Sequence, residues 1–398
     1  MYLLKKNALA LVACWLMLSS CSGPEPYANI SVSEKNGLPR ELEYVTAEIP
    51  LPVEWQPSQI LVATDRESEE SVSVQVLDTM RNEGKSFLKI MFPVNVGANG
   101  TKTFELVTAE KIRGTGSSNI RISDDGSSLE NQTYKATFSM EDDPRGGQIN
   151  GIFLKNFSNK MLKRGHIAMH WAPNFSKTDG DGYFNMEDFP PSSENTIETG
   201  LYQIMKTRSG RTDTIPEIYV KGKYTFLAGL PYFIFESTMT MEEEVSLKLL
   251  RNDEMTMDSL FTHVAYQKED GTLSSLQLYD AELDSLENNH IPDDSGFVAF
   301  YNTDYGYGLA SIRLEYDNTN SDGNPSPLFN PHTKISRSQG NGRYWNRVLI
   351  DSATTAPKGS RYHEKNAYLV FEVDQAVPEK QIQYYAERLK HPLKVAVK

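Results

Sequence analysis

The sequence predicts an all-β protein, with a small N-terminal β-sandwich followed by a large antiparallel β-supersandwich and few short helices. Apolar and polar residues alternate with a period of two in short segments along most of the 398 residues, as expected for half-buried strands. Turn residues such as those at 97–100 separate these segments. Helical spacing is confined to Met255 to Phe261 and Glu379 to Leu389.

The first twenty residues have the pattern of an export signal. Lys5 and Lys6 precede an apolar run from Ala8 to Leu18, which is too short to span a bilayer as a helix. Small residues then lead into Cys21, an arrangement that resembles a lipobox. We therefore expect residues 1–20 to be a lipoprotein signal peptide and Cys21 to carry a lipid. The protein would be exported and anchored to a membrane, on the periplasmic or surface face of the outer membrane. An ordinary secretory signal is the alternative.

Composition excludes several classes of function. The second cysteine, Cys14, lies within the predicted signal, so the exported chain has no pair for a disulfide. The formal net charge of −13 argues against broad nucleic-acid binding. The sequence has no Gly-x-Ser-x-Gly, no His-Glu-x-x-His and no phosphate-binding loop, which disfavours serine hydrolases, zincins and nucleotide enzymes.

After the predicted signal peptide, the chain divides into three parts. Residues 21–40 are polar and predict a tether. Alternating segments between 41 and 112 predict the N-terminal β-sandwich. Gly/Ser-rich stretches at 114–118 and 124–128 mark a boundary, after which strand-like segments over 127–398 predict the supersandwich.

The second domain opens with a recognisable strand pattern. Asn131, Tyr134 and Phe138 stand in the spacing Asn-x-x-Tyr-x-x-x-Phe, and a Gly-Gly-x-Ile-x-x-Ile sequence follows at 146–152. Together with the small N-terminal sandwich, this pattern resembles the galactose-mutarotase-like β-supersandwich of polysaccharide lyases and other carbohydrate-active lipoproteins, over most of residues 40–385. The chain is most similar to exo-acting lyases of rhamnogalacturonan or of rhamnosyl-glucuronate caps. The resemblance implies glycan cleavage and transfers no catalytic residue.

A first candidate site segment runs from 163 to 173. If it is a strand, Arg164, His166 and His170 share one face, beside the indole of Trp171 that could stack on a sugar ring. The alternative is a strand that buries Met169 and Trp171 and leaves two solvated histidines.

A second candidate is the run of four polar residues from Arg251 to Glu254. A simple turn needs only one or two such residues, so the run predicts a site loop, with His263 farther along the chain. Alternatively, Asn252 or Asp253 caps a short helix that starts at Met255.

A third segment gives the strongest site signal. Four proton-handling or hydrogen-bonding residues enter an apolar strand, where active sites are commonly built: Arg361, Tyr362, His363 and Glu364. Just upstream, Arg343 and Trp345 combine a cation with a ring, as expected for binding an acidic sugar. A solvated edge turn is the alternative.

A fourth segment offers oxygen ligands at 179, 181 and 185. Asp179, Asp181 and Asn185 are spaced like part of a calcium loop, but the twelve-residue pattern ending in a bidentate Glu is not reproduced. A Gly-rich turn is therefore favoured, and we expect no cofactor, with calcium as the minority alternative.

The favoured function is β-elimination on a uronic-acid-containing glycan of pectic or arabinogalactan type. This reaction needs a cation for the uronate carboxylate, a base for the neighbouring proton and an acid for the leaving oxygen. The candidate catalytic residues are His166, His363, Tyr362 and His263. The candidate substrate-binding residues are Arg164, His170, Trp171, Arg251, Asn252, Glu254, Arg343, Trp345, Arg361 and Glu364.

Two alternatives remain open. One is a glycoside hydrolase with paired carboxylates, for which the candidates are Asp253, Glu254, Glu364 and Glu217. The other is a glycan-binding lipoprotein without catalysis. The enzymatic interpretation assumes one shared cleft that contains His166, His170, Arg251, His263, Arg361 and His363. The expected partners are an acidic polysaccharide and, through Cys21, a membrane; nucleic acid is not expected.

Overall fold

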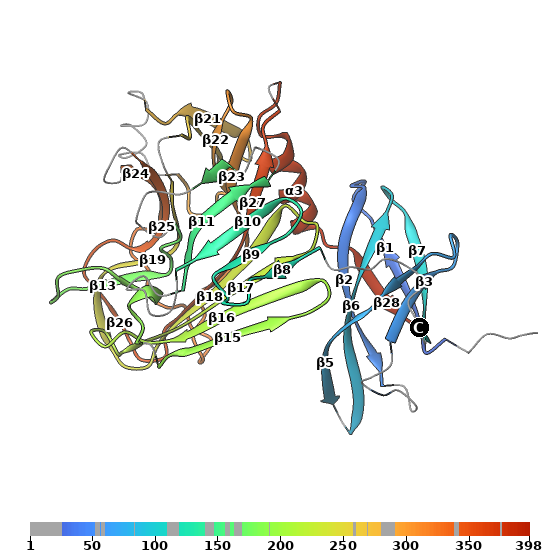
Figure 1. Ribbon diagram of the computed structural model, residues 1–398. Helices are drawn as coiled ribbons and strands as arrows, with labels where there is room; N and C mark the ends of the chain where they lie inside the picture. The colour runs from blue at the N-terminus through green and yellow to red at the C-terminus, as the bar shows by residue number, and fades with distance from the viewer. Residues whose placement is uncertain are drawn as a thin grey trace, which may run out of the picture. The chain divides into compact units, whose positions relative to one another are not determined.

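The computed structural model describes residues 26–51, 56, 60–82, 84–109, 119–139, 147–155, 160–162, 169–190, 192–257, 260–268, 270–279, 291–337, 342–374 and 376–398. Strands dominate these residues, and the all-β prediction is confirmed (Figure 1). The chain forms two compact units, Met1–Gly116 with Leu393–Lys398, and Ser117–Pro392. The predicted signal and Cys21 lie outside the described residues. In the described ranges, no helix is long and apolar enough to cross a membrane.

Unit 1 is a sandwich of two antiparallel sheets. One sheet has the order β28-β1-β7-β3-β4 and the other β2-β6-β5. Alternate residues such as Ile30, Leu61, Ile90 and Phe92 are buried and form its core, as a period of two requires. The strands are β1 (Ala28–Ser33), β2 (Arg40–Pro50), β3 (Ile60–Asp65), β4 (Ser71–Ser73), β5 (Gln75–Asn82), β6 (Lys85–Val96), β7 (Thr101–Ala109) and β28 (Lys394–Val397).

Both ends of the described chain belong to this first unit. The predicted tether at 21–40 contains β1, in which Ala28, Ile30 and Val32 alternate with half-buried residues. The last strand, β28, pairs antiparallel with β1 from Ile30↔Val397 to Ser33↔Lys394. Residues that the sequence assigned to the second domain therefore complete the first. Periodicity could not reveal this, because strand pairing across the whole chain leaves no local signal.

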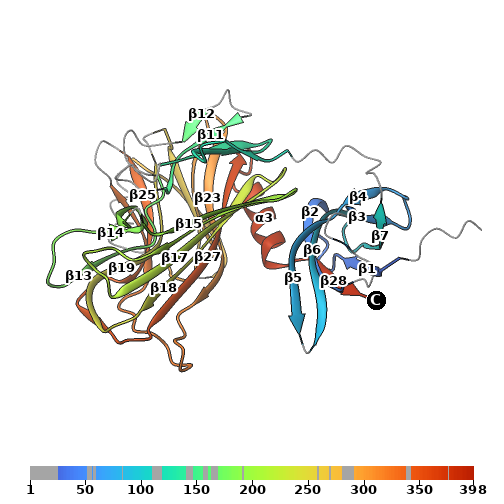
Figure 2. The same cartoon turned by 60° about the horizontal axis from the view of Figure 1, so that its bottom comes forward.

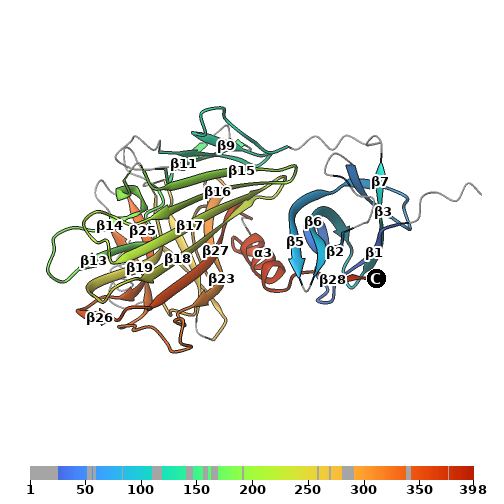
Figure 3. The ribbon, with the colours of Figure 1, turned by 90° about the horizontal axis from the view of Figure 1, so that it is seen from below.

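Unit 2 contains three sheets. The large sheet has the order β15-β16-β17-β18-β27-β23-β22-β20-β21, and Figure 3 shows β15 to β18 and β27 side by side. Its strands are β15 (Glu194–Thr199), β16 (Gln203–Gly210), β17 (Ile218–Leu227), β18 (Tyr232–Met241), β20 (His263–Gln267), β21 (Leu273–Gln277), β22 (Phe297–Asn302), β23 (Tyr307–Asp317) and β27 (Arg361–Glu372).

The other two sheets of unit 2 are smaller. The six-stranded sheet contains β13 (Asn174–Lys177), β14 (Phe184–Asn185), β19 (Val245–Met257), β24 (His332–Arg337), β25 (Arg343–Ile350) and β26 (Thr354–Ala356). The five-stranded sheet contains β8 (Arg121–Ile122), β9 (Ser128–Glu130), β10 (Tyr134–Phe138), β11 (Ile149–Leu154) and β12 (Lys160–Leu162). A short 3-10 helix, η3 (Met186–Asp188), follows β14.

Both smaller sheets pack on the same face of the large sheet (Figure 2). Phe138 of β10 places its ring 6.0 Å from that of Tyr224 on β17, and Trp345 of β25 packs edge-on against Phe300 of β22 at 5.0 Å. The helix α3 (Lys380–Lys390) contacts β23 and β27. We call the face of the six-stranded sheet that contacts the large sheet its inner face, and the opposite face its outer face.

One helix prediction is confirmed and the other is wrong. The helix expected at Glu379 to Leu389 is α3. The stretch from Met255 to Phe261 contains the end of β19, where Met255 pairs with Trp345. Its apolar residues face the packed interior of a sandwich, and a short apolar run does not distinguish a buried strand from a helix. The predicted site loop at 251–254 is likewise part of β19.

We expect the β28 pairing to stabilise unit 1 through Val395, which packs against its core, whereas Val397 is 37% exposed. Val395→Ala should lower the free energy of unfolding of unit 1 by about 1 kcal/mol. Val397→Ala, the same change two residues along the strand, should cost clearly less. Chemical denaturation of both variants checks this, and equal losses would contradict the described register.

Candidate functional site

Three of the predicted segments meet on the six-stranded sheet. His170 forms a β-bridge with Met255, and the Trp171 N–H donates to the carbonyl of Glu254 at 3.2 Å. Strand β19 in turn pairs with β25, which contains Arg343 and Trp345. Residues from three distant parts of the sequence therefore lie next to one another. Arg164 and His166 are outside the described residues.

Asp253 is the centre of a buried polar network on the inner face. Its Oδ1 accepts hydrogen bonds from Tyr368 Oη at 2.8 Å and from Trp345 Nε1 at 3.1 Å. Its Oδ2 accepts one from Ser311 Oγ at 2.8 Å. The carboxylate is fully buried, and such a group is tolerated only when hydrogen bonds compensate its lost hydration. Asp253 thus ties β19 to β23, β25 and β27.

His170 belongs to the same network. Its Nδ1 is hydrogen-bonded to Tyr224 Oη, and its Nε2 lies 3.3 Å from Tyr368 Oη. Burial lowers the pKa of His170 to about 3, so the ring is neutral at physiological pH. The side chain is fully buried and does not form the exposed basic ribbon that the sequence suggested.

Three other predicted binding residues also have buried side chains. Trp345 is fully buried, so it offers no surface to a sugar ring in this structure. Glu364 accepts from Arg347 Nη1 at 2.9 Å, and burial raises the pKa of Glu364. Arg343 places its guanidinium 4.3 Å from the ring centre of Tyr279 and donates through Nε to the carbonyl of Leu278.

The segment with the strongest sequence signal alternates across the large sheet. His363 Nδ1 is hydrogen-bonded to Thr238 Oγ1 at 2.9 Å, and Arg361 pairs with Asp317 at 2.8 Å. Tyr362 points to the other face, where its hydroxyl donates to a backbone carbonyl at 2.6 Å and burial raises its pKa. Adjacent residues of a strand point to opposite faces, so Tyr362 and His363 cannot act together on one substrate.

His263 lies apart from all of these residues. Its ring stacks on that of Tyr301, with centres 5.1 Å apart. Among the described residues, the assumed single cleft is therefore absent. His170 is in the core, Arg361 and His363 share one face of the large sheet, and His263 is on β20.

The outer face of the six-stranded sheet carries a different set of residues. Asp253, Trp345 and Thr333 all point inward, toward the large sheet. Their neighbours along each strand must therefore point outward. Register places Glu254 opposite Asn346, and Asn346 opposite Lys334, with about 5 Å between adjacent strands. Asn174 Nδ2 donates to Glu254 Oε2 at 2.9 Å. We call these four outward residues the polar row: Asn174, Glu254, Asn346 and Lys334.

A strand irregularity places Arg251 beside the polar row. Residues three apart in a regular strand point to opposite faces, but the pairing of β19 with β25 shifts register on both sides of Arg251, as in a β-bulge. Arg251 Nη1 consequently reaches Glu254 Oε2 at 3.0 Å. Its guanidinium also lies 5.9 Å from the ring centre of Tyr183, which is 64% exposed.

Several polar atoms here have no hydrogen-bond partner within the described part of the chain. Asn346 is fully buried, and neither its Nδ2 nor its Oδ1 is paired. Hydrogen-bond partners are also lacking for Asn174 Oδ1, Arg251 Nε, and Oδ1 and Nδ2 of Asn252. Each unpaired buried polar group costs about 1–3 kcal/mol, so a partner such as a ligand or water is expected. No ion pair of Lys334 is found among the described residues.

Sequence reasoning included Arg251 and Glu254 but missed Asn174, Tyr183, Asn346 and Lys334. The alternation within β25 could have separated Asn346 from Trp345 and Arg347. Nothing local could have placed Lys334 beside Asn346, because that neighbourhood depends on which strands pair.

The segment considered for calcium is a turn beside this face. The side chain of Asn185 caps η3, accepting from the N–H of Glu187 at 2.6 Å. Asp179 and Asp181 are exposed. Within the described ranges, no group of three or more His, Cys, Asp or Glu could hold a metal ion.

Comparisons with known proteins inform the fold. No protein-family model and no curated protein matches this sequence. Among solved structures, a protein in glycosyl hydrolase family 38 from Enterococcus faecalis has a TM-score of 0.55 at 11% identity, covering 98% of this chain and 50% of its own. An α-mannosidase from Enterococcus faecalis V583 has a TM-score of 0.56 at 11% identity, covering 98% and 48%. These likenesses show a shared fold.

This chain spans about half the length of those two proteins. A galactose mutarotase-like protein from Lactobacillus casei ATCC 334 is also similar, with a TM-score of 0.36 and 10% identity over 61% of this chain and 99% of its own. A TM-score this low supports no argument. The resemblance to the mutarotase-like family therefore stays a prediction from the strand pattern.

The buried His170 should make stability depend on pH. The folded state holds it neutral, with a pKa of about 3 against an ordinary value of 6.5. Its stabilising contribution is therefore complete above pH 6.5 and is lost as pH falls toward 3. Between pH 6.5 and pH 5 the loss should be about 2 kcal/mol. Urea unfolding at both pH values, compared with His170→Gln, isolates this group, because the variant should lack that part of the pH dependence.

Proposed function

We propose that this protein binds an acidic glycan over the outer face of the six-stranded sheet, along the polar row. The observation that carries the proposal is the unpaired, fully buried amide of Asn346 between the carboxylate of Glu254 and the ammonium group of Lys334. An amide both donates and accepts hydrogen bonds, as sugar hydroxyls do. Asn346 is fully buried, so the side chains that cover it on the outer face must move aside for a bound sugar to satisfy its amide.

The neighbouring side chains have complementary chemistry. Lys334 supplies a cation for the carboxylate of a uronic acid, and Glu254 accepts from hydroxyls. Tyr183 offers an exposed ring beside Arg251, and an aromatic ring with a polar tip suits the apolar face of a sugar. The fold shared with a family 38 glycosyl hydrolase and an α-mannosidase adds support for a carbohydrate ligand, although fold alone does not determine function.

The ammonium group of Lys334 on β24 should determine whether the protein prefers acidic to neutral sugars. Lys334→Gln is expected to weaken binding of a uronate-containing oligosaccharide by about tenfold, equivalent to about 1.4 kcal/mol, and to leave binding of its neutral counterpart unchanged. Lys135→Gln changes a similarly half-buried lysine on β10 and should have no effect. Isothermal titration calorimetry with both oligosaccharides provides the measurement. Equal affinity of wild type for the two ligands would contradict recognition of the acid.

A second candidate function is cleavage of the bound glycan by β-elimination. Hydrolysis by paired carboxylates needs two acids across the bond, and the polar row has one, Glu254. Elimination needs a cation at the uronate and groups that accept and donate a proton. Lys334, Glu254 and the hydroxyl of Tyr344 have these chemical types. Tyr344 lies two residues before Asn346 and so on the same face of β25.

Elimination leaves an unsaturated uronate that absorbs in the ultraviolet. Incubation with pectic and arabinogalactan polysaccharides should therefore raise the absorbance, and Glu254→Gln and Tyr344→Phe should each lower the rate by about 100-fold or more. Tyr305→Phe changes an exposed tyrosine on the β22–β23 turn and serves as the control. Products that have new reducing ends but no ultraviolet absorbance would show that the glycan is hydrolysed, and would contradict elimination.

The place of action is part of the same proposal. The signal pattern at residues 1–20 and the cysteine at 21 support export and a lipid anchor. We propose that the protein meets its glycan outside the cytoplasm, held at the outer membrane through Cys21.

A further inference from the structure

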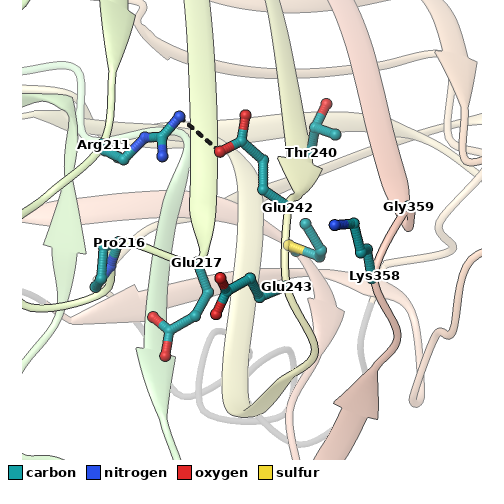
Figure 4. A pocket seen from close by; sticks show the side chains of 9 residues that line it. Arg211, Pro216, Glu217, Thr240, Glu242, Glu243, Lys358 and Gly359 are labelled. Carbon is teal, nitrogen blue, oxygen red and sulfur yellow. Dashed lines mark ion pairs between the residues drawn. The ribbon is translucent and has the colours of Figure 1, made fainter.

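A second concave site in unit 2 shares no lining residue with the polar row. Three turns form it: the segment before β17, the β18–β19 turn and the β26–β27 turn (Figure 4). Its volume is about 590 Å³, within the range of small-molecule sites. The lining residues are Arg211, Pro216, Glu217, Thr240, Met241, Glu242, Glu243, Lys358 and Gly359. We call it the turn groove.

Backbone hydrogen bonds fix the walls of the turn groove. The N–H of Glu242 donates to the carbonyl of Glu217 at 2.8 Å, and that of Gly359 to the carbonyl of Met241 at 2.7 Å. Gly359 has a φ of 87°, a backbone conformation that side-chain-bearing residues rarely adopt. The three turns are therefore tied to one another, and a ligand would find the groove already formed.

Three of the five charged residues that line the turn groove already have ion-pair partners. Arg211 pairs with Glu242 at 2.6 Å, and Lys177 pairs with Glu217 at 2.8 Å. Glu217 Oε2 nevertheless is buried and has no hydrogen-bond partner among the described residues. Burial is the largest single influence on Glu217 and opposes its ionisation. The hydrogen bond from Lys177, a backbone hydrogen bond and the charge of Lys177 together outweigh burial, so the pKa of Glu217 is lowered. Glu217 is therefore a carboxylate whose Oε2 accepts no hydrogen bond from the described residues.

Glu243 and Lys358 have no ion pair within the described part of the chain. Figure 4 shows the Glu243 carboxyl group on the side of the groove that carries Glu217, and the Lys358 amine extending in from the other side. A cation between the two carboxylates would relieve their repulsion. Lys358 and the hydroxyl of Thr240 would meet uncharged oxygen atoms of the same ligand.

The groove does not suit a metal ion. Calcium takes six to eight oxygen ligands, and no set of three or more metal-binding side chains occurs here or elsewhere in the described ranges. An ammonium group needs only a few acceptors. The apolar atoms of the exposed Pro216 provide surface for the carbon skeleton that carries it.

We propose that the turn groove binds a sugar with a free amino group, its ammonium placed between Glu217 and Glu243 and its hydroxyls toward Lys358 and Thr240. This site is separate from the polar row and does not depend on the function proposed there. In a glycan that contains both kinds of unit, it would provide a second point of attachment.

The test uses glucosamine, N-acetylglucosamine and glucose with the purified protein. Methionine-methyl NMR follows Met241, and calorimetry gives the affinity. Glucosamine should shift the Met241 signal and bind at least tenfold more tightly than the other two sugars, which lack the ammonium group. Equal binding of glucosamine and N-acetylglucosamine, or no shift of Met241, would overturn the proposal.

Matched variants locate the interaction. Glu243→Gln should weaken glucosamine binding about tenfold, because it removes an exposed charge from the groove. Glu244→Gln changes the next residue, which does not line the groove, and should leave glucosamine binding unchanged. Both positions are exposed, so folding should survive, which a thermal melt verifies. Lys334→Gln should leave glucosamine binding intact, so failure of this site and failure of the polar row give different results. An equal loss in Glu243→Gln and Glu244→Gln would indicate general charge attraction and overturn the site.

Discussion

The buried carboxylate of Asp253 is the interaction on which the second unit depends. It accepts hydrogen bonds from Ser311, Trp345 and Tyr368, which come from three strands in two facing sheets. A buried charge with these partners fixes both the distance and the register of the sheets, because any slip would leave it without compensation. Its position also fixes the outward direction of its neighbour Glu254. The order of the core therefore determines which side chains point away from the large sheet.

This arrangement explains why neighbouring polar residues have different roles. Asp253 and Glu254 are adjacent in sequence, yet one is enclosed between sheets and the other pairs with Arg251 at the outer face. The shifts in register around Arg251 allow that pair to form. A run of polar residues within a strand thus divides between two faces: Asp253 belongs to the buried network of the inner face, and Glu254 belongs to the polar row of the outer face.

Much of the fold could be predicted from period-two alternation. The segments at 218–226, 233–241 and 308–316 are strands, and the amphipathic stretch near the C-terminus is a helix. The segment that begins at Met255 was wrongly predicted to be a helix, because a short apolar run does not distinguish a buried strand from a helix. The C-terminal strand could not be assigned to the first unit, because its pairing partner lies more than 360 residues earlier.

The candidate site was only partly predictable, for the same physical reason. Arg251 and Glu254 were identified by their clustering, and Trp345 and His170 by their chemistry. The latter two proved to be enclosed, since the face to which a residue points depends on strand register. Lys334 and Asn346 become neighbours only when β24 pairs with β25, information that no local window contains.

The pairing of β1 with β28 has a consequence for how the protein is made. Synthesis proceeds from the N-terminus, yet the edge strand of the first sheet is formed by residues 394–397. Strand β1 therefore lacks its partner β28 until the whole of the second unit has been synthesised. Domains usually fold in the order in which they emerge. In this chain the first unit is completed only after the second unit has been synthesised.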